Sequence, residues 1–331
     1  MPDTSLDVLA IGNAIVDVIA GSDDDFLAAE GLVKGSMRLI DAEEAERLYG
    51  RMAPGRETSG GSAANTVAGV AALGLRAGFI GQVAGDQLGE VFRHDIRALG
   101  VEFETPARNG EVPTARCLIL VTPDAQRTMN TFLGASQYLP ASAIDARQIE
   151  QAAILYLEGY LWDPAEPRAA MEHAIAIARG AGRQVAFTLS DSFCVDRHRG
   201  DFLALIDGGK IDILFANEHE IQSLTGENDV DAAIAAVAPR LPLLVVTRSE
   251  KGAIAVEHGQ RTEVPAVQGV EVVDTTGAGD LFAAGFLAGR ANGRPVKRCL
   301  EMGAVAAAEV ISHYGARPEA DLNALLAAQL R

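Results

Sequence analysis

The chain has 331 residues, of which 48% are hydrophobic and 5% aromatic, a length and apolar content that suit one large or two unequal α/β units with a full core. Its formal net charge of −17 would repel a polyanion such as nucleic acid, although local donors could still hold a small anion. The three cysteines are far apart in the sequence, which indicates neither a disulfide framework nor a zinc site.

Strand-like and helix-like segments alternate along most of the chain. Residues 7–20 begin as a buried strand, residues 62–74 read as a helix of small residues that ends at a glycine, and residues 77–84 form the next apolar run. Further strands are expected at residues 152–160, 183–190, 211–217 and 241–247, and helices at 86–100, 164–180 and from 278 to 331. Short apolar runs separated by helices predict an α/β fold with a mostly parallel central sheet and helices on both faces.

Residues 33–40 and 111–133 interrupt this alternation. Their strand-like segments alternate apolar and polar positions and are separated by the turn "TPDAQ". They predict a small antiparallel sheet, apart from the main one, that could open and close as a lid over a cleft. An edge extension of the main sheet is the alternative. Because no linker is evident, we expect a single domain over residues 1–331 with an inserted lid built from about 13–20, 33–40 and 111–133.

The N-terminal stretch "MPDTSLDVLAIGNAIVDVIAG" carries no basic leader. No run in the sequence approaches the roughly 18 apolar residues that a membrane span needs. We therefore expect a cytoplasmic protein that does not bind a membrane. The oligomeric state is left open between a monomer and a homodimer, because a lid sheet with one apolar face could be shielded by a second copy.

The segment "DTTGAGD" from Asp274 to Asp280 stands before an apolar helix. Gly277, Ala278 and Gly279 leave room for backbone N–H groups to bind an anion at the helix start. No Gly-Lys-Ser/Thr end follows, so this is not a Walker loop. A carboxylate beside such an anion hole can accept the proton of an attacking hydroxyl during phosphoryl transfer, which makes Asp280 a candidate general base. Its alternative role is favourable placement in the first turn of the helix.

A second group of polar residues surrounds a diglycine. Gly60 and Gly61 lead into a helix in which Asn65 lies about one turn from the start, so its amide can point back over the turn. Asn13 and Asp17 interrupt an apolar segment upstream, and Asp17 could accept hydrogen bonds from two neighbouring hydroxyls. These residues suit a polyol substrate, although Asp17 could equally be a turn residue.

The third site follows the strand expected at residues 211–217. Asn217 and Glu220 are three residues apart at the start of a helix, at the carboxyl edge of the sheet where ligands of open α/β folds bind. An amide and a carboxylate there could hold the water shell of Mg²⁺. The alternative is a capping box, and both roles can coexist.

In order and spacing, these segments together resemble the PfkB family of carbohydrate and nucleoside kinases, also called the ribokinase family, over nearly the whole chain. The resemblance rests on the diglycine helix near residue 60, on Asn217-x-x-Glu220 and on the "DTTGAGD" segment, which matches the family signature Asp-Thr-x-Gly-Ala-Gly-Asp. The resemblance implies a ribokinase-like fold with a lid, an ATP- and Mg²⁺-dependent reaction on a hydroxyl group, and catalysis by Asp280.

The resemblance also assigns roles to the other candidates. It implies that Gly277, Ala278 and Gly279 form the anion hole, that Asn217 and Glu220 organise magnesium, and that Asn13, Asp17, Gly60, Gly61 and Asn65 bind the substrate. Arg127 matches a lid position that reaches the transferred phosphate, which a guanidinium fork suits. Nucleotide contacts would come from Asn217, Thr247, Gly252, Gly277 and Gly279, although Ser249 replaces the first glycine of the family loop Thr-x-Gly-x-x-Gly.

Within the family, "IGNAIVDV" and "PDAQRTMNTFLGAS" resemble the adenosine kinase branch. The implied reaction is transfer of phosphate from ATP to the 5′-hydroxyl of adenosine, as in purine salvage. Met37, Leu39, Leu133 and Phe187 are candidates for a flat adenine slot, or else core and lid packing. A sugar kinase for ribose, fructose or a related polyol and a catalytically silent nucleotide-binding regulator are the alternatives. Activation by K⁺ is a further expectation, with Asp274 and Thr276 near the implied loop.

Overall fold

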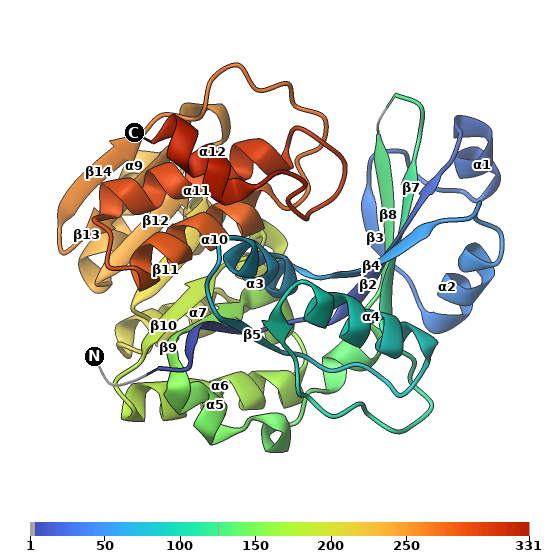
Figure 1. The fold of residues 1–331 in the computed structure, drawn as a ribbon, viewed down its shortest axis with the longest axis horizontal. Helices are drawn as coiled ribbons and strands as arrows, with labels where there is room; N and C mark the ends of the chain where they lie inside the picture. Colours follow the sequence, from blue (N-terminus) through green and yellow to red (C-terminus); the bar gives the residue numbers. More distant parts are fainter. Residues whose placement is uncertain (1–3, 125, 331) are drawn as a thin grey trace.

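The computed structural model describes residues 4–124 and 126–330, and it places nine strands in one central sheet (Figure 1). Their order is β14-β13-β12-β11-β10-β9-β1-β5-β6. The strands are β1 (Leu6–Ile11), β5 (Ala77–Ile80), β6 (Val101–Glu102), β9 (Ala152–Glu158), β10 (Gln184–Thr188), β11 (Ile213–Asn217), β12 (Leu243–Thr247), β13 (Ala253–Glu257) and β14 (Gln260–Val264). All pair in parallel except the edge hairpin β13–β14, which runs antiparallel on β12. The mostly parallel sheet is therefore confirmed, while the hairpin had not been predicted.

Helices cover both faces of this sheet, so each face has its own apolar core. Along β1, Val8 and Ala10 belong to one core and Leu9 and Ile11 to the other, which explains the continuous apolar run of a doubly covered strand. The helices are α1 (Asp24–Ala29), α2 (Ala42–Tyr49), α3 (Ser62–Ala72), α4 (Gln87–Ala98), α5 (Ala146–Gln151), α6 (Ala165–Gly180), α7 (Ser192–Asp207), α8 (Glu218–Thr225), α9 (Val230–Val237), α10 (Ala278–Ala291), α11 (Val296–Val310) and α12 (Leu322–Gln329).

A second, smaller sheet of five strands stands beside the main one, which confirms that it is separate. It contains β2 (Ile15–Gly21), β3 (Met37–Leu39), β4 (Arg56–Gly60), β7 (Ala115–Val121) and β8 (Arg127–Phe132), in the order β3-β8-β7-β2-β4. The prediction of an antiparallel sheet is wrong in part, because β2 pairs with β7 and β3 with β8 in parallel. The sequence analysis also missed β4, whose residues are mostly polar.

One face of the small sheet is covered by helices and the other is turned toward the main part of the chain. Helices α1 and α2 lie on the outer side in Figure 1, where Leu27 and Leu48 join a core with Val16, Val18 and Leu118. The outer face of the small sheet thus shares an apolar core with one face of the main sheet, and its other face is turned toward the main part of the chain.

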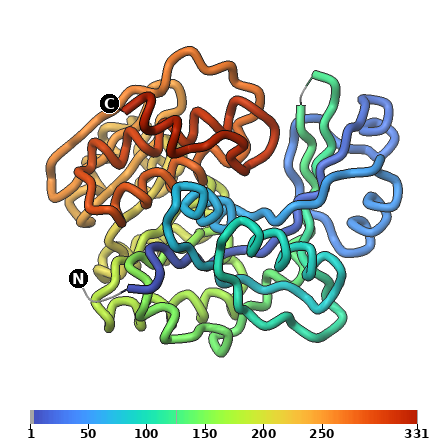
Figure 2. The backbone as a smooth tube through the Cα atoms, in the orientation of Figure 1, coloured from blue at the N-terminus to red at the C-terminus, as the bar shows by residue number. Residues whose placement is uncertain are grey.

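The chain enters and leaves the small sheet twice, and these junctions place the candidate site (Figure 2). It first enters between β1 and β2, through Gly12 and Asn13, and returns between β4 and α3, through Gly61. Both junctions lie at the carboxyl end of β1, where ligands of open α/β sheets bind. Among the helices described by the structure, none is long and apolar enough to cross a membrane.

Candidate active site

The "DTTGAGD" segment forms the turn that opens α10. Gly277 caps the helix with φ 77°, a left-handed conformation that favours glycine. A Cβ at Gly277 would lie 2.7 Å from the Cβ of Ala316, so a side chain there would also collide. At Gly279, by contrast, a Cβ would meet no atom within 4 Å, so the turn is open on that side. The start of α10 can therefore present backbone N–H groups to an anion.

Asp280 lies in the first turn of α10, but its carboxylate contacts α3. Oδ1 accepts a hydrogen bond from Ser62 Oγ at 2.6 Å and Oδ2 accepts one from Asn65 Nδ2 at 2.9 Å. Burial raises the pKa of Asp280, while these two hydrogen bonds and the charge of Arg317 lower it. These contacts hold the carboxylate across the diglycine turn rather than on the N–H groups of its own helix, and they bring Asp280 and Asn65 together.

The diglycine turn lies directly against the residues proposed to hold a polyol. Asp17 is opposite Thr58 in the β2–β4 pair, and a Cβ at Gly60 would overlap the Asp17 carboxylate. Gly61 has φ 98° and a Cβ there would overlap the carbonyl oxygen of Asn13. Burial raises the pKa of Asp17 to about 6, against the opposing charges of Arg317 and Arg127. Glycine is therefore required by close backbone approach as well as by conformation.

Glu158 is a site residue that the sequence analysis missed. It is fully buried at the end of β9, where Oε1 accepts hydrogen bonds from Asn13 N at 2.6 Å and from Asn13 Nδ2 at 2.7 Å. Oε2 accepts one from Ala63 N at 2.8 Å. Burial raises the pKa of Glu158 to about 7, although these donors favour the ionised form. An acidic residue ending an apolar strand was the available signal.

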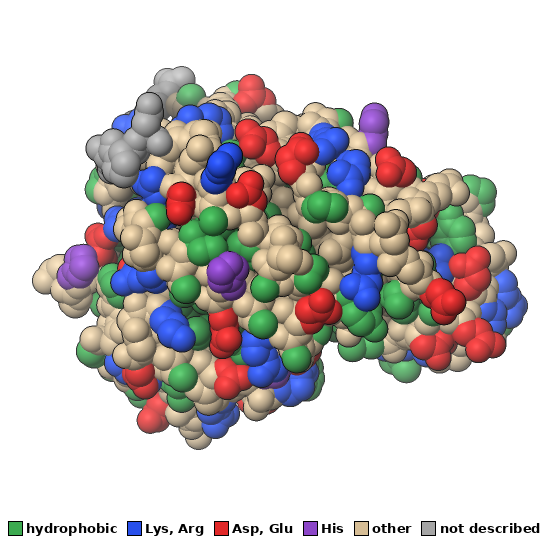
Figure 3. All heavy atoms as spheres, turned by 90° about the horizontal axis from the view of Figure 1, so that it is seen from below, with side chains coloured by type: hydrophobic (Ala, Val, Ile, Leu, Met, Phe, Trp, Pro, Cys, Tyr) green, Lys and Arg blue, Asp and Glu red, His purple; other side chains and the backbone are tan. Residues whose placement is uncertain are grey.

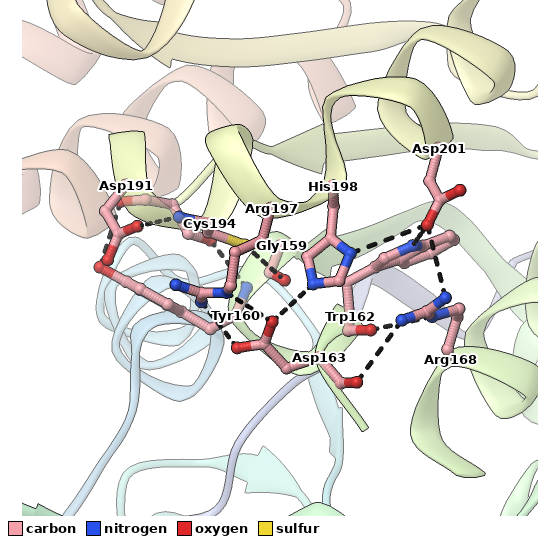
Figure 4. Close-up of polar contacts among 11 residues, drawn as sticks. Gly159, Tyr160, Trp162, Asp163, Arg168, Asp191, Cys194, Arg197, His198 and Asp201 are labelled. Carbon is pink, nitrogen blue, oxygen red and sulfur yellow. Dashed lines mark hydrogen bonds and ion pairs between the residues drawn. The ribbon is translucent and has the colours of Figure 1, made fainter. Parts of the chain in front are cut away.

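The loop that follows Glu158 is held by a polar network on α7 (Figure 4). Arg197 donates two hydrogen bonds to the Asp163 carboxylate, at 2.9 and 2.7 Å, and His198 Nε2 lies 2.5 Å from the same group. Trp162 Nε1 donates to Asp201 Oδ2 at 3.1 Å. This network fixes the connection between β9 and α6, and therefore the end of β9 as well.

Arg127 extends from β8 of the small sheet to the signature turn. Its Nη2 lies 2.6 Å from Asp274 Oδ2, and both side chains are less than a tenth exposed. Its Nη1 donates to Thr276 Oγ1 at 3.3 Å, and the guanidinium lies 5.6 Å from the centre of the Tyr314 ring. Nε and Nη2 have no aligned hydrogen-bond partner among the described residues. Nη2 is held by the Asp274 carboxylate as an ion pair, so among the described residues Nε is the buried donor that remains for an anionic ligand such as a phosphoryl group.

Asp274 does not fit the expected monovalent-cation site in this conformation. Its Oδ1 accepts hydrogen bonds from the N and Oγ1 of Thr276, at 3.0 and 2.8 Å. Its Oδ2 accepts one from Gly315 N at 3.0 Å and also faces Arg127. A carboxylate offers about four lone-pair positions, and here each has a partner. The positive charge beside Asp274 is a guanidinium.

Asn217 and Glu220 form a complete capping box at the start of α8. Asn217 Oδ1 accepts from Glu220 N at 2.9 Å, while Asn217 Nδ2 and N donate to the two oxygens of Glu220 at 2.7 and 2.9 Å. Burial raises the pKa of Glu220 to about 7, and the nearby Asp191 carboxylate adds to this. Within the described part of the chain, no group of three or more His, Cys, Asp or Glu could hold a metal ion by itself. Glu220 retains lone pairs for metal-bound water, and the Asn217 amide retains one N–H and one lone pair.

The loop after β12, where nucleotide contacts are expected, contains Ser249 in place of the first glycine of the family pattern. Ser249, which stands where the family has glycine, adopts φ 49°, the left-handed region that glycine enters most easily. Gly252 has φ 91°, and a Cβ there would overlap the backbone of Val264. Thr247 ends β12 beside Asn217 of β11. The loop therefore keeps the shape expected of glycine in spite of the serine.

A hollow of about 570 Å³ lies beside the signature turn, between the 267–271 segment and α11. Glu309 lines it, and its Oε1 accepts from His313, Glu319 N and Ala320 N, whereas its Oε2 is a buried atom without a partner among the described residues. Val267 and Val270 form part of the wall of the hollow and are apolar. The hollow thus has a mixed lining, in which valines, alanines and a leucine alternate with polar side chains such as Glu271, Ser312 and Gln329.

The four candidates for an adenine slot separate into two groups. Met37 and Leu39 are 54% and 63% exposed on β3 of the small sheet, and Leu133 is half-buried after β8. Phe187 is fully buried on β10 and packs edge-on against Phe202, at 5.0 Å between ring centres. The interpretation of Phe187 as a base contact is therefore wrong, because it belongs to the core of the main sheet.

Comparisons with known proteins agree with this geometry. The model of the pfkB family of carbohydrate kinases matches residues 25–322. The chain is 31% identical over 279 residues to an ATP-dependent ribose-1-phosphate kinase of Halopiger xanaduensis, covering 80% of this chain and 85% of that protein. It is 30% identical over 241 residues to a fructokinase of Salmonella typhimurium, covering 71% and 78%.

Two solved structures match nearly the whole chain. The adenosine kinase of Sinorhizobium meliloti is 50% identical, with a TM-score of 0.90 and coverage of 98% of this chain and 99% of that one. A "probable sugar kinase protein" of Rhizobium etli CFN 42 is 48% identical, with a TM-score of 0.91 and coverage of 98% of both chains. The chain therefore belongs to the pfkB family of carbohydrate kinases.

Proposed function

We propose that this protein transfers the γ-phosphate of ATP to the 5′-hydroxyl of adenosine, giving AMP. The observation that carries the choice of a nucleoside is an apolar surface next to Asp17 on the cleft face of the small sheet. The strand register aligns Asp17 with Cys117, Thr131 and Leu39 in one row. The adjacent row on the same face contains Ile19, Ile119, Met129 and Met37.

Such a face suits a substrate that is polar at one end and apolar at the other. The Asp17 carboxylate can accept hydrogen bonds from the two ribose hydroxyls. Met37 and Leu39, both more than half exposed, can cover the flat base. A free sugar would leave these apolar side chains in water, which disfavours it by lost burial at about 25 cal/mol per Å². The relatedness to an adenosine kinase at 50% identity supports the same choice.

The donor side is supported by the signature turn and the residues near it. Nε of Arg127 lacks a partner among the described residues, while Nη2 pairs with Asp274, and the guanidinium beside the signature turn can hold the transferred phosphoryl with the amides of the Gly277 to Gly279 turn. The hollow between the 267–271 segment and α11 offers Val267 and Val270 as an apolar surface for the nucleotide base. Mg²⁺, when bound with ATP, neutralises phosphate charge, and Glu220 is the residue placed to orient its water.

In the proposed reaction, Asp17 and Asn65 orient the ribose, and the small sheet closes over the cleft and excludes water. The 5′-hydroxyl then faces Asp280, whose carboxylate takes the proton as the oxygen attacks the γ-phosphorus of ATP. The bond from this phosphorus to the β–γ bridging oxygen breaks, and ADP leaves with its electron pair. Ser62 and Asn65 fix the direction of that carboxylate through their hydrogen bonds. Arg127 and the turn amides hold the charge of the transferred group.

The test is a coupled assay of ATP use with adenosine, inosine, guanosine, ribose and fructose as acceptors. We expect adenosine to give the highest kcat/KM, and Asp280→Asn to lower kcat by about 10²–10⁴-fold because the base is lost while its size is kept. Asp229→Asn, at an exposed helix cap of α9, is the matched control and should leave kcat unchanged. Higher kcat/KM for ribose or fructose would replace the proposal by a sugar kinase, and tight nucleotide binding without turnover would indicate a silent regulator.

A further inference from the structure

Arg317 binds the backbone around the diglycine turn, and it lies outside the sequence motifs described above. It lies between α11 and α12, 253 residues from Ala64 and 258 from Ser59 in the sequence. Nη1 donates to the carbonyl oxygen of Ala64 at 2.6 Å, and Nη2 donates to that of Ser59 at 2.7 Å. One guanidinium therefore binds the backbone on both sides of Gly60 and Gly61.

The same turn is held from its other side by α4. The Asp95 carboxylate accepts hydrogen bonds from Ser59 N at 2.7 Å and from Ser59 Oγ at 2.6 Å, and Nη2 of Arg317 lies 3.1 Å from that hydroxyl. Ser59 thus lies between a carboxylate of α4 and the guanidinium of Arg317. The planar fork of arginine can reach two separated carbonyls at once, which the single ammonium of lysine cannot do.

The charge of Arg317 also acts on the reacting end of the site. Burial lowers the pKa of Arg317 to about 10, against the attraction of Asp17, Asp95 and Asp280, so it stays charged at neutral pH. Its positive charge lowers the pKa values of Asp17 and Asp280, which burial raises. Its Nε is buried and has no partner among the described residues, so the guanidinium is held through Nη1 and Nη2.

We propose that Arg317 is a positioning residue for phosphoryl transfer, which holds the diglycine turn so that Ser62 and Asn65 meet the Asp280 carboxylate. Both of these side chains belong to the first turns of α3, where Ser62 lies between the two carbonyls that Arg317 binds and Asn65 directly follows the second. If the turn shifts, the orientation of the carboxylate shifts with it. The inference rests on the proposed role of Asp280 as the base.

The test compares Arg317→Met with Arg317→Lys in pH profiles of kcat and kcat/KM for adenosine. The methionine variant loses both the positive charge and the two hydrogen bonds of the guanidinium. Because the Asp280 carboxylate is then misplaced, kcat should fall by about 10²-fold, and the acid limb of the pH profile should move to higher pH. The lysine variant keeps the charge but reaches one carbonyl, so its acid limb should stay near the wild-type position while kcat is still reduced. The other titratable groups that interact with Asp280 are Asp17, Glu158, Tyr156 and Tyr160, and both variants keep these residues, although Arg317→Met should also raise the pKa of Asp17.

Arg97→Met is the matched control. Arg97 also binds a backbone carbonyl, that of Phe103, through Nε and Nη2 at 2.9 and 2.5 Å, but it lies at the end of α4 and contacts neither Ser59 nor the turn. We expect it to lower the unfolding temperature without moving the pH profile. If Arg317→Met behaved in the same way, with unchanged kcat per folded molecule and an unchanged acid limb, Arg317 would be structural only.

A second measurement does not depend on turnover. Carbon-13 NMR titration of labelled aspartates, with Asp280→Asn to assign the signal, reads the pKa of Asp280 directly in wild type and in Arg317→Met. A higher pKa in the variant supports the inference, and an unchanged pKa overturns it. An inactive wild type with all five acceptors would instead refute the proposed function while this titration still decides the role of Arg317.

Discussion

Replacing Glu158 by glutamine tests how the two chain junctions are held. The amide oxygen can still accept the two hydrogen bonds from Asn13. In the wild type, Ala63 N donates to Glu158 Oε2 at 2.8 Å, and in the variant an NH₂ group replaces this oxygen, so two donors face each other. One buried backbone N–H loses its acceptor, which costs about 1–3 kcal/mol. We expect the free energy of unfolding to fall by that amount, and KM for adenosine to rise because Asn13 and the start of α3 are no longer fixed together.

Urea unfolding followed by circular dichroism measures the free energy of unfolding, and initial rates at varied adenosine concentration measure KM. Asp229→Asn serves as the control, because its single hydrogen bond from Ala232 N at 2.9 Å can be accepted equally well by an amide oxygen. We expect its unfolding free energy to change by less than about 0.5 kcal/mol. Equal stability and equal KM for Glu158→Gln and wild type would show that the buried carboxylate does not hold the junctions.

Two further variants test the cleft. Gly60→Ala places a Cβ where the Asp17 carboxylate lies, so KM for adenosine should rise by about tenfold or more. The control is Gly180→Ala, whose Cβ meets no atom within 4 Å and which should leave KM unchanged. Equal KM values for the two variants would contradict the close approach of Gly60 to Asp17. Arg127→Met removes the donors proposed for the phosphoryl group, so kcat should fall by about 10²-fold. Its control is Arg116→Met, since Arg116 pairs with Glu46 on the outer side of the small sheet, and a similar loss in both variants would remove Arg127 from the mechanism.

Local patterns in the sequence were sufficient for the main architecture. Apolar runs between helices predicted the central sheet, because burial on both faces requires every position of a parallel strand to be apolar. The hairpin β13–β14 and the edge strand β4 were nevertheless missed, although β13 is itself a buried apolar run. Strand β4 has the sequence "RETSG" and gains its structure from pairing with β2, and the outer strand β14 is mostly exposed, so neither carries an apolar period.

The sequence by itself also determined the motif residues, since glycines at Gly61 and Gly277 and an aspartate after the turn are needed by local backbone geometry and chemistry. Only the tertiary structure decided what holds them. Glu158 meets Asn13 across 145 residues, and Arg317 meets Ser59 across 258, so no spacing in the sequence links them. Arg127 likewise meets Asp274 only because two sheets face each other. Hydrogen bonds and charges act over a few ångströms in space, whereas sequence patterns report only neighbours along the chain.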